Sequence, residues 1–201
     1  MRYSQSKYIH IYSYTGMKIF NTASWYGRKK YLKYYNLVLS AIEKTGVELI
    51  ATEKGNYKEI LSGAEKAKLP TERLIHYEAI RRGILSADAV IIEISNEDFQ
   101  LGHEATLAIQ AKKPVLCLSV HEDFSEKINN PYFFAAKYSE YTVEEIIEEF
   151  IKRCQKRQLS ERFNLFISPN EVQYLEKTAA DRKMNKSEYL RSLIDKDQKA
   201  K

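Results

Sequence analysis

The chain has 201 residues, 44% of them hydrophobic, which is enough for one well-buried core and a small additional unit. The 32 Lys and Arg residues outnumber the 27 Asp and Glu residues, so the net charge is +5, which permits acidic partners without demanding them. Two cysteines exclude a disulfide framework and a four-cysteine zinc site, and they fit a reducing compartment. No stretch approaches the roughly 20 apolar residues that span a bilayer, so we expect a cytoplasmic protein without a membrane partner.

The first 70 residues predict two strands, one helix and an irregular segment. Residues 8–14 are rich in aromatic and β-branched types and precede Gly16, which predicts a strand followed by a loop. Apolar side chains recur at helical spacing over 26–44, and residues 47–52 predict the second strand. Residues 53–70 have no clean period, so we expect a loop with at most a short helix.

The middle of the chain carries the clearest pattern. Helical spacing predicts a helix over 72–86. Residues 89–95 then form a nearly continuous apolar run, as expected for a parallel strand that is covered on both faces. A helix over 102–112 and a fourth, buried strand over 115–120 complete this alternation.

A short fifth strand is expected over 137–141, and Thr142 with Glu145 forms a capping box that opens a helix. Strands that alternate with helices predict an α/β fold for residues 1–154: a flavodoxin-like, five-stranded parallel sheet with helices on both faces. Ligands of such sheets bind beyond the carboxyl ends of the strands, where the strand order reverses. This rule places the loops after strands one and three at the site.

The remaining residues predict a small second unit. Residues 155–160 are polar and basic and are expected to be a linker to a unit over 161–201. A strand over 163–167 leads into two helices, whose capping boxes begin at Ser168 and Asn185. One strand and two short helices bury too little surface alone, so we expect this unit to pair with a copy of itself, in a homodimer or homotetramer.

Residues 76–119 resemble the nucleoside 2-deoxyribosyltransferases and the related 2'-deoxynucleoside 5'-phosphate N-hydrolases. The resemblance lies in a helix that ends in Ala87-Asp88, a strand that ends in Glu93-Ile94-Ser95, and the pattern Asp98-x-x-x-Gly102-x-Glu104. With weaker agreement it extends over 8–152. It implies a nucleoside or nucleotide ligand and no cofactor.

The resemblance also implies roles for three residues. Glu104 matches the family's nucleophile, which attacks the anomeric carbon as the base departs and forms a glycosyl ester. Asp98 matches an aspartate that positions the nucleophile and the sugar. Gly102 is expected to let the backbone approach the sugar. Because an aspartate repels a 5'-phosphate, we expect a nucleoside rather than a nucleotide. A charge that favours the helix start is the structural alternative for Glu104.

One position departs from the family pattern. The family's second acidic residue, which assists the leaving base, falls at Ile80, and isoleucine cannot donate a proton. Glu78 lies about 200° away around a helix, whereas His76 lies on roughly the same face. His76 is therefore the candidate substitute, with packing in the helix face as its alternative role.

Further ligand contacts are expected around the predicted strand ends. Glu93 and Ser95 end the third strand, with a structural role as the alternative for Glu93. Asn129 lies where the family contributes residues across a subunit interface, although a turn before Pro131 explains it equally well. No metal site is expected, because His103-Glu104 lacks the second histidine of a zinc helix. The candidates near the first strand are Tyr12, Ser13, Tyr14 and Gly16.

Residues 161–195 resemble ribbon-helix-helix domains, which pair their strands as dimers and insert the two-stranded ribbon into the major groove. If Phe163, Leu165 and Ile167 face the core, the residues between them face outward and can contact bases, and the start of the second helix can contact phosphates. The resemblance thus implies duplex DNA as a partner, and dimerisation without DNA is the alternative. The predicted DNA-binding residues are Arg162, Asn164, Lys186 and Ser187.

The sequence therefore supports two functions. The first is an N-glycosidase or deoxyribosyltransferase that cleaves the N-glycosidic bond of a 2'-deoxynucleoside or nucleotide through Glu104. The second is a catalytically impaired, nucleoside- or nucleotide-binding regulator that binds DNA as a ribbon-helix-helix dimer, which Ile80 favours. Release of free base, lost in Glu104→Ala, distinguishes the enzyme; salt-dependent binding of duplex DNA distinguishes the regulator.

Overall fold

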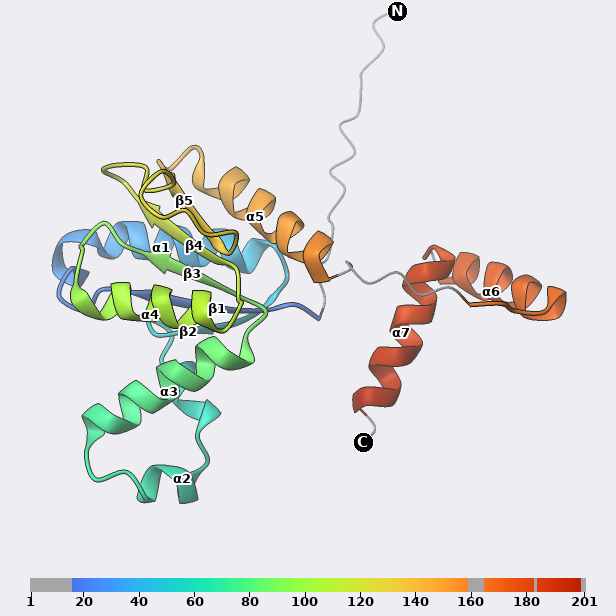
Figure 1. Ribbon diagram of the computed structural model, residues 1–201, viewed down its shortest axis with the longest axis horizontal. Coiled ribbons are helices and arrows are strands. Elements are labelled where there is room, and N and C mark those ends of the chain that lie inside the picture. The colour runs from blue at the N-terminus through green and yellow to red at the C-terminus, as the bar shows by residue number, and fades with distance from the viewer. Residues whose placement is uncertain (1–15, 159–164, 183, 200–201) are drawn as a thin grey trace, which may run out of the picture. The chain divides into compact units, whose positions relative to one another are not determined.

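The computed structural model describes residues 16–158, 165–182 and 184–199. The chain divides into two compact units, Met1–Ser160 and Glu161–Lys201, which are described separately (Figure 1). Across the described ranges, no helix has the length and apolar character that crossing a membrane requires.

The first unit is built on a five-stranded, all-parallel sheet in the order β2-β1-β3-β4-β5. This order reverses direction between β1 and β3, as in flavodoxin-like folds, and confirms the predicted fold class. β1 runs beside β3 from the pair Ile19 and Ala89 to the pair Ala23 and Glu93. The strands are β1 (Lys18–Ala23), β2 (Glu48–Ala51), β3 (Ala89–Glu93), β4 (Val115–Ser119) and β5 (Phe133–Lys137).

Helices cover both faces of this sheet (Figure 1). On one face, α1 (Arg28–Lys44) and α5 (Val143–Gln158) pack against Ile91 of β3. On the other face, α3 (Glu72–Ser86) and α4 (Phe99–Gln110) pack against Ile92. Side chains alternate between the two faces along a strand, so the uninterrupted apolar run of β3 fills both cores. The remaining elements are η1 (Asn56–Ile60) and α2 (Gly63–Ala67), which precede α3.

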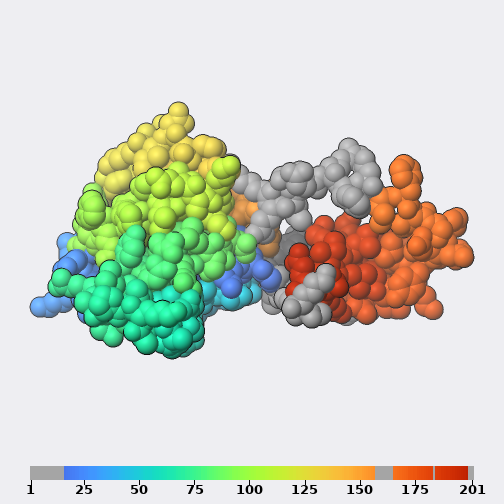
Figure 2. All heavy atoms as spheres, turned by 60° about the horizontal axis from the view of Figure 1, so that its bottom comes forward, coloured from blue at the N-terminus to red at the C-terminus, as the bar shows by residue number. Residues whose placement is uncertain are grey.

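The close fit of α3 on the sheet depends on Gly83. A Cβ atom built at Gly83 would lie 2.2 Å from the Phe20 side chain, which is itself fully buried. Phe20 belongs to β1, so the missing side chain at Gly83 lets α3 approach the strand. Figure 2 shows the outer face over α2, α3 and α4, in teal to green.

The sheet contains a strand, β1, that the sequence analysis did not predict. β1 is formed by Lys18–Ala23, whereas residues 8–14, with Tyr12, Ser13 and Tyr14, lie outside the described residues. Gly16 accordingly precedes β1, with a φ of +100°, instead of following the first strand. Pattern analysis did not find β1 because the buried polar residue Asn21 interrupts its apolar run. The side-chain amide of Asn21 donates to the Ile91 carbonyl oxygen.

Three other predicted boundaries need correction. The fifth strand is Phe133–Lys137 rather than 137–141, and Tyr138 instead donates its backbone N–H to Ser119 beyond the ladder. α4 begins three residues before the predicted 102 because Asp98 caps it. The predicted linker over 155–160 begins within α5, which continues to Gln158. The irregular stretch 53–70 holds η1 and the five-residue α2.

The second unit contains α6 (Pro169–Asp181) and α7 (Lys186–Lys199). The capping box of Ser168 and Glu171 is formed, and Asn185 and Glu188 exchange the corresponding bonds at 2.8 and 2.9 Å. A small core joins the helices through Leu175, Ala179 and Tyr189. Residues 165–167 form no strand in the single chain, so the ribbon-helix-helix assignment stays a prediction. The exposed apolar residues of this unit are Leu165, Phe166, Tyr174, Met184, Leu193 and Ile194.

Candidate functional site

The loops after β1 and β3 meet at Ser24, as the position of the strand-order reversal predicts. The Ser24 hydroxyl donates to Asp98 Oδ2 and accepts from the Asn96 side-chain amide at 3.0 Å and from the Gly27 backbone N–H at 3.3 Å. The Tyr35 hydroxyl donates to the Ser24 carbonyl oxygen at 3.1 Å. Ser24 is buried, so these bonds fix the crevice between the two loops.

Asp98 holds the start of α4. It is the N-cap residue, and its Oδ1 accepts from the Leu101 backbone N–H at 3.0 Å, while Oδ2 accepts from Ser24. Both oxygens are therefore engaged within the protein. The side chain positions α4, and with it Glu104, which lies six residues further along.

Glu104 projects from α4 into the protein and is only 2% exposed. Its Oε1 accepts a hydrogen bond of 2.9 Å from Gln100 Nε2, whereas its Oε2 is buried without a partner among the described residues. Burial raises the pKa of this carboxyl to about 7; the charge of Asp98 acts in the same direction, and the side chains of Gln100 and Thr22 oppose it. An ionisable group near neutrality with one free oxygen is a candidate reacting group.

A cleft opens beside this carboxyl at the carboxyl ends of β1 and β2. Two aromatic side chains at its mouth are strongly exposed, Trp25 at 70% and Tyr26 at 84%. Arg28 lies 5.2 Å from the Trp25 ring centroid and forms an ion pair of 3.2 Å with Glu53. The cleft is lined by Thr22, Ala23, Ser24, Trp25, Tyr26, Thr52, Glu53, Tyr57, His76, Ile80, Asp98, Gln100 and Leu101.

A narrow apolar hollow adjoins this cleft and is lined by Glu104. Ile80 and Gln100 line both spaces, so these two side chains separate the cleft from the carboxyl. Thr52 Oγ1 in the cleft wall is buried and, like Glu104 Oε2, has no partner in the described part of the chain. The hollow is completed by Tyr77, Arg81, His103 and Leu107.

His76 lies at the cleft, but its ring is already engaged. Nδ1 lies 2.8 Å from the Tyr57 hydroxyl, and Nε2 lies 3.3 Å from Gln100 Nε2. Burial lowers the pKa of His76, with a further contribution from the charge of Lys58. The ring is therefore neutral at pH 7, and Ile80, at 4% exposure, offers no proton in its place.

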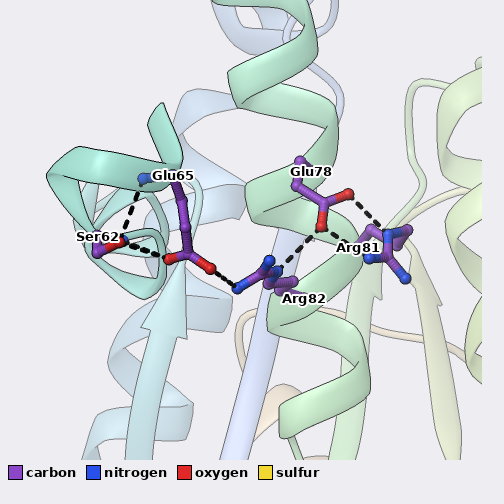
Figure 3. A network of polar contacts seen from close by, with 5 residues as sticks. All are labelled: Ser62, Glu65, Glu78, Arg81 and Arg82. Atoms are coloured by element: carbon purple, nitrogen blue, oxygen red, sulfur yellow. Dashed lines mark hydrogen bonds and ion pairs between the residues drawn. The ribbon is translucent and has the colours of Figure 1, made fainter. Parts of the chain in front are cut away.

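Glu78 is excluded as a substitute acid by its ion pairs (Figure 3). Its two oxygens bind Arg81 at 2.8 and 2.7 Å, and Oε1 also binds Arg82 at 3.0 Å. The hydrogen bonds from these guanidinium groups hold the pKa of Glu78 at about 2. Arg82 also binds Glu65, which closes the capping box of α2 with Ser62. This network joins α2 to α3 and leaves no protonated carboxyl there.

Glu93 and Ser95 lie at the end of β3 but do not line the cleft. Glu93 is fully buried and accepts hydrogen bonds from the Ser95 hydroxyl and from the Tyr138 hydroxyl at 3.0 Å. Ser95 in turn accepts from the Val120 backbone N–H at 3.0 Å. Burial raises the pKa of Glu93 to about 7, and these donors oppose the rise. The contacts correspond to the structural alternative for Glu93.

The other predicted site residues are spread more widely. Gly102 is exposed on α4 with open space around it, and Asn129 is exposed between β4 and β5; neither lines the cleft. Lys186 and Ser187 are exposed at the start of α7, where Lys186 pairs with Glu176 at 2.8 Å. Arg162 and Asn164 lie outside the described residues. Within the described ranges, no group of three or more His, Cys, Asp or Glu residues could hold a metal.

Sequence analysis missed the residues of the loop after β1. Ser24 and Gly27 lie directly before α1. Gly27 has no room for a side chain, because a Cβ atom there would lie 2.4 Å from both Asn96 and the Tyr35 hydroxyl. Such a Ser-x-x-Gly step between a strand and a helix indicates a tightly packed turn. The cleft residues that the sequence analysis missed, from this loop and elsewhere, are Thr22, Ala23, Ser24, Trp25, Tyr26, Thr52, Glu53, Tyr57, Gln100 and Leu101.

Comparison with known proteins gives similar folds but no family. No family model and no curated protein matches the chain. A CMP N-glycosidase, BcmB, from Clostridium botulinum is 12% identical, with a TM-score of 0.45 over 66% of this chain and 98% of that chain. A prokaryotic SEFIR domain is 14% identical (TM-score 0.43; 75% of this chain and 99% of that chain). A Sir2 enzyme is 11% identical (TM-score 0.38; 73% and 96%).

Replacing Glu93 by Gln is predicted to change how stability depends on pH. Below pH 4.5 the Glu93 carboxyl is protonated in the folded and in the unfolded protein. Between pH 4.5 and 7 it ionises in the unfolded chain but stays protonated in the folded protein. The free energy of unfolding of the wild type, relative to Glu93→Gln, should therefore fall across this window by at most about 3 kcal/mol and stay constant above it. Urea unfolding from pH 4 to 8 measures this difference, and parallel curves for the two proteins would contradict it.

Proposed function

We propose that the first unit is an N-glycosidase or deoxyribosyltransferase that cleaves the N-glycosidic bond of a 2'-deoxynucleoside or nucleotide, with Glu104 as its nucleophile. The observation that carries this proposal is the buried Oε2 of Glu104, which has no partner among the described residues. Glu104 lines a hollow that shares Ile80 and Gln100 with the cleft whose mouth is aromatic. Leaving a carboxylate oxygen unpaired in the interior costs free energy, and such costs concentrate at functional sites.

The reaction follows from the chemistry of a carboxylate beside a sugar. Glu104 Oε2 forms a bond to the anomeric carbon as the N-glycosidic bond breaks and its electron pair leaves with the base. The base then takes a proton. Water, or a second base, next attacks the same carbon, breaks the glycosyl ester and restores the carboxylate. The nucleophile must be ionised, so the rate should rise as the pH passes the Glu104 pKa of about 7.

The mouth of the cleft suits a nucleobase. Trp25 and Tyr26 present flat, exposed rings on which a base can stack, and Thr22 and Thr52 supply hydroxyl groups in the cleft wall. Asp98 acts on Glu104 through α4, because both of its oxygens already bind Leu101 and Ser24. Its negative charge remains and disfavours a 5'-phosphate beside it.

The sugar reaches Glu104 Oε2 only when a side chain between the cleft and the carboxyl moves. Ile80 and Gln100 occupy that position. Turning Ile80 breaks no hydrogen bond, whereas turning Gln100 breaks its bond to the carboxylate, a type of bond that contributes about 1.5–3 kcal/mol. Ile80 is therefore the side chain that yields.

Replacing Glu104 by Gln should abolish base release. The variant keeps the size of the side chain but removes the nucleophile, so the rate should fall at least about a thousandfold. The measurement is chromatography of free base after long incubation with a panel of deoxynucleosides and their 5'-monophosphates. Glu97→Gln is the matched control and should keep full activity, because Glu97 is an exposed carboxylate in the loop between β3 and α4. Equal base release by both variants would exclude Glu104 as the nucleophile.

The identity of the base should control the rate steeply. A positioned acid contributes about 10²–10⁴-fold to such reactions, and here Ile80 and the neutral His76 provide none. The rates should therefore follow the acidity of the base N–H, so that uracil, thymine and hypoxanthine leave much faster than cytosine. The kcat/KM values of deoxyuridine, thymidine, deoxyinosine and deoxycytidine test this order. Release of cytosine as fast as uracil would reveal an acid that this account lacks.

The second candidate function is a nucleoside- or nucleotide-binding regulator that acts on DNA through the second unit. Ile80 favours this function because it cannot donate a proton to a leaving base. The capped helices α6 and α7 favour it because they leave apolar side chains exposed. In this case the apolar residues would be covered by a second copy, and Arg162 and Asn164 would read bases from the paired strands.

Replacing Lys186 by Ala should then weaken binding to duplex DNA and reduce the slope of log affinity against log salt by about one. Arg162→Ala should weaken binding as well. The matched control is Lys196→Ala, which removes an exposed charge further along α7. Fluorescence anisotropy with a mixed-sequence duplex at several salt concentrations makes the measurement. Equal affinities for Lys186→Ala, Lys196→Ala and the wild type would exclude phosphate contact by Lys186.

A further inference from the structure

The side chain of Gln100 joins the candidate nucleophile to the helix that packs beside it. Its Nε2 lies 2.9 Å from Glu104 Oε1 on α4 and 3.3 Å from His76 Nε2 on α3. His76 Nδ1 in turn lies 2.8 Å from the hydroxyl of Tyr57, which is buried in η1. Three elements therefore contribute to one chain of contacts that ends on a single oxygen of Glu104.

Counting hydrogens fixes the direction of this chain. The Gln100 amide nitrogen carries two protons, and one is donated to the carboxylate while the other points to His76 Nε2. His76 must then accept at Nε2, so its own proton resides on Nδ1 and is donated to Tyr57. The neutral ring that this arrangement requires agrees with the burial that lowers the pKa of His76. His76 thus orients Gln100, and its Nε2 has no proton to give to a leaving base.

We propose that Gln100 is the positioning residue of Glu104: held by His76, it binds Oε1 and leaves Oε2 for the anomeric carbon. The inference rests on the proposed function, which identifies Glu104 as the nucleophile. A bond to one oxygen also fixes the plane of the carboxylate, and attack on carbon requires such alignment.

Other charges near Glu104 do not take over this task. Asp98 raises the pKa of Glu104, because a nearby like charge disfavours ionisation. Arg81 lines the same hollow, but its guanidinium is bound by both oxygens of Glu78. β1 contributes the Thr22 hydroxyl, which also lowers the pKa of Glu104 but by less than Gln100 does. The titratable or charged residues that line the cleft and the hollow, apart from Glu104, are Tyr26 after β1, Glu53 after β2, Tyr57 in η1, His76, Tyr77 and Arg81 in α3, Asp98 at the N-cap of α4, and His103 in α4.

The test is a direct titration of Glu104 in Gln100→Met, which keeps the length of the side chain but removes the donor. Protein labelled with ¹³C at the glutamate carboxyl is followed by NMR over pH, and Glu104→Gln and Glu93→Gln identify the two resonances that titrate near 7. We expect the pKa of Glu104 to rise by about 1 in Gln100→Met. Gln110→Met, an exposed position near the end of the same helix, is the matched control and should leave the pKa unchanged.

Two further variants extend the test. Gln100→Glu keeps the length but replaces the donor by a second carboxyl, so it should raise the pKa of Glu104 further. His76→Phe keeps a ring against Tyr57 but removes the acceptor for Gln100, so it should give a smaller rise in the same direction.

The outcomes for Gln100 and for the proposed function are distinct. If the pKa of Glu104 is the same in Gln100→Met, Gln110→Met and the wild type, the positioning role is overturned, whether or not the protein releases base. If the pKa rises and the protein releases base, the pH dependence of base release must shift by the same amount. If the pKa rises but the wild type releases no base, Gln100 positions Glu104 as inferred, and the glycosidase proposal is the part that fails.

Discussion

The parallel pairing of β1 with β3 is the constraint on which the candidate site depends. It is the point where the sheet order reverses, so the two loops that leave these strands diverge to opposite faces and open a crevice between them. Ser24 closes the base of that crevice by binding Asp98 and Asn96 from the other loop. Asp98 then caps α4 and sets its start, which fixes where Glu104 lies. One strand pairing thus determines the position of Glu104 through a short series of contacts.

The interior around Glu104 departs from the rule that buried polar atoms are satisfied. Thr52 Oγ1 and Glu104 Oε2 are the buried side-chain atoms without a partner in the described ranges; Thr52 lines the cleft, and Glu104 lines the hollow that shares Ile80 and Gln100 with it. Each such atom costs about 1–3 kcal/mol. The apolar cores on the two faces of the sheet provide the stability against which this cost is set. Two such atoms beside adjoining spaces support the proposed ligand site better than either atom alone.

The sequence predicted the sheet better than the crevice for a physical reason. β3 and α3 carry continuous apolar or helical patterns because they are buried on both faces or along one stripe, and pattern analysis finds them. β1 lies inside the sheet but contains three polar residues: Lys18 pairs with Glu48, Asn21 donates to the Ile91 carbonyl oxygen, and Thr22 lines the cleft. The strand and the loop after it were therefore missed. Glu104 and Asp98 were predicted through a motif. Gln100 lies one helical turn before Glu104 on α4, but its contact with His76 joins α4 to α3, which no local pattern records.

Trapping the glycosyl ester tests the central claim most directly. A 2'-deoxy-2'-fluoroarabino-nucleoside should form the ester with Glu104 but hydrolyse it slowly, because the fluorine destabilises positive charge on the sugar in both steps. Intact mass spectrometry and peptide mapping then locate the adduct. This account predicts one sugar per chain, attached to the peptide that contains Glu104 and absent in Glu104→Gln. Release of base from the natural nucleoside with no adduct on Glu104, or with an adduct elsewhere, would contradict it.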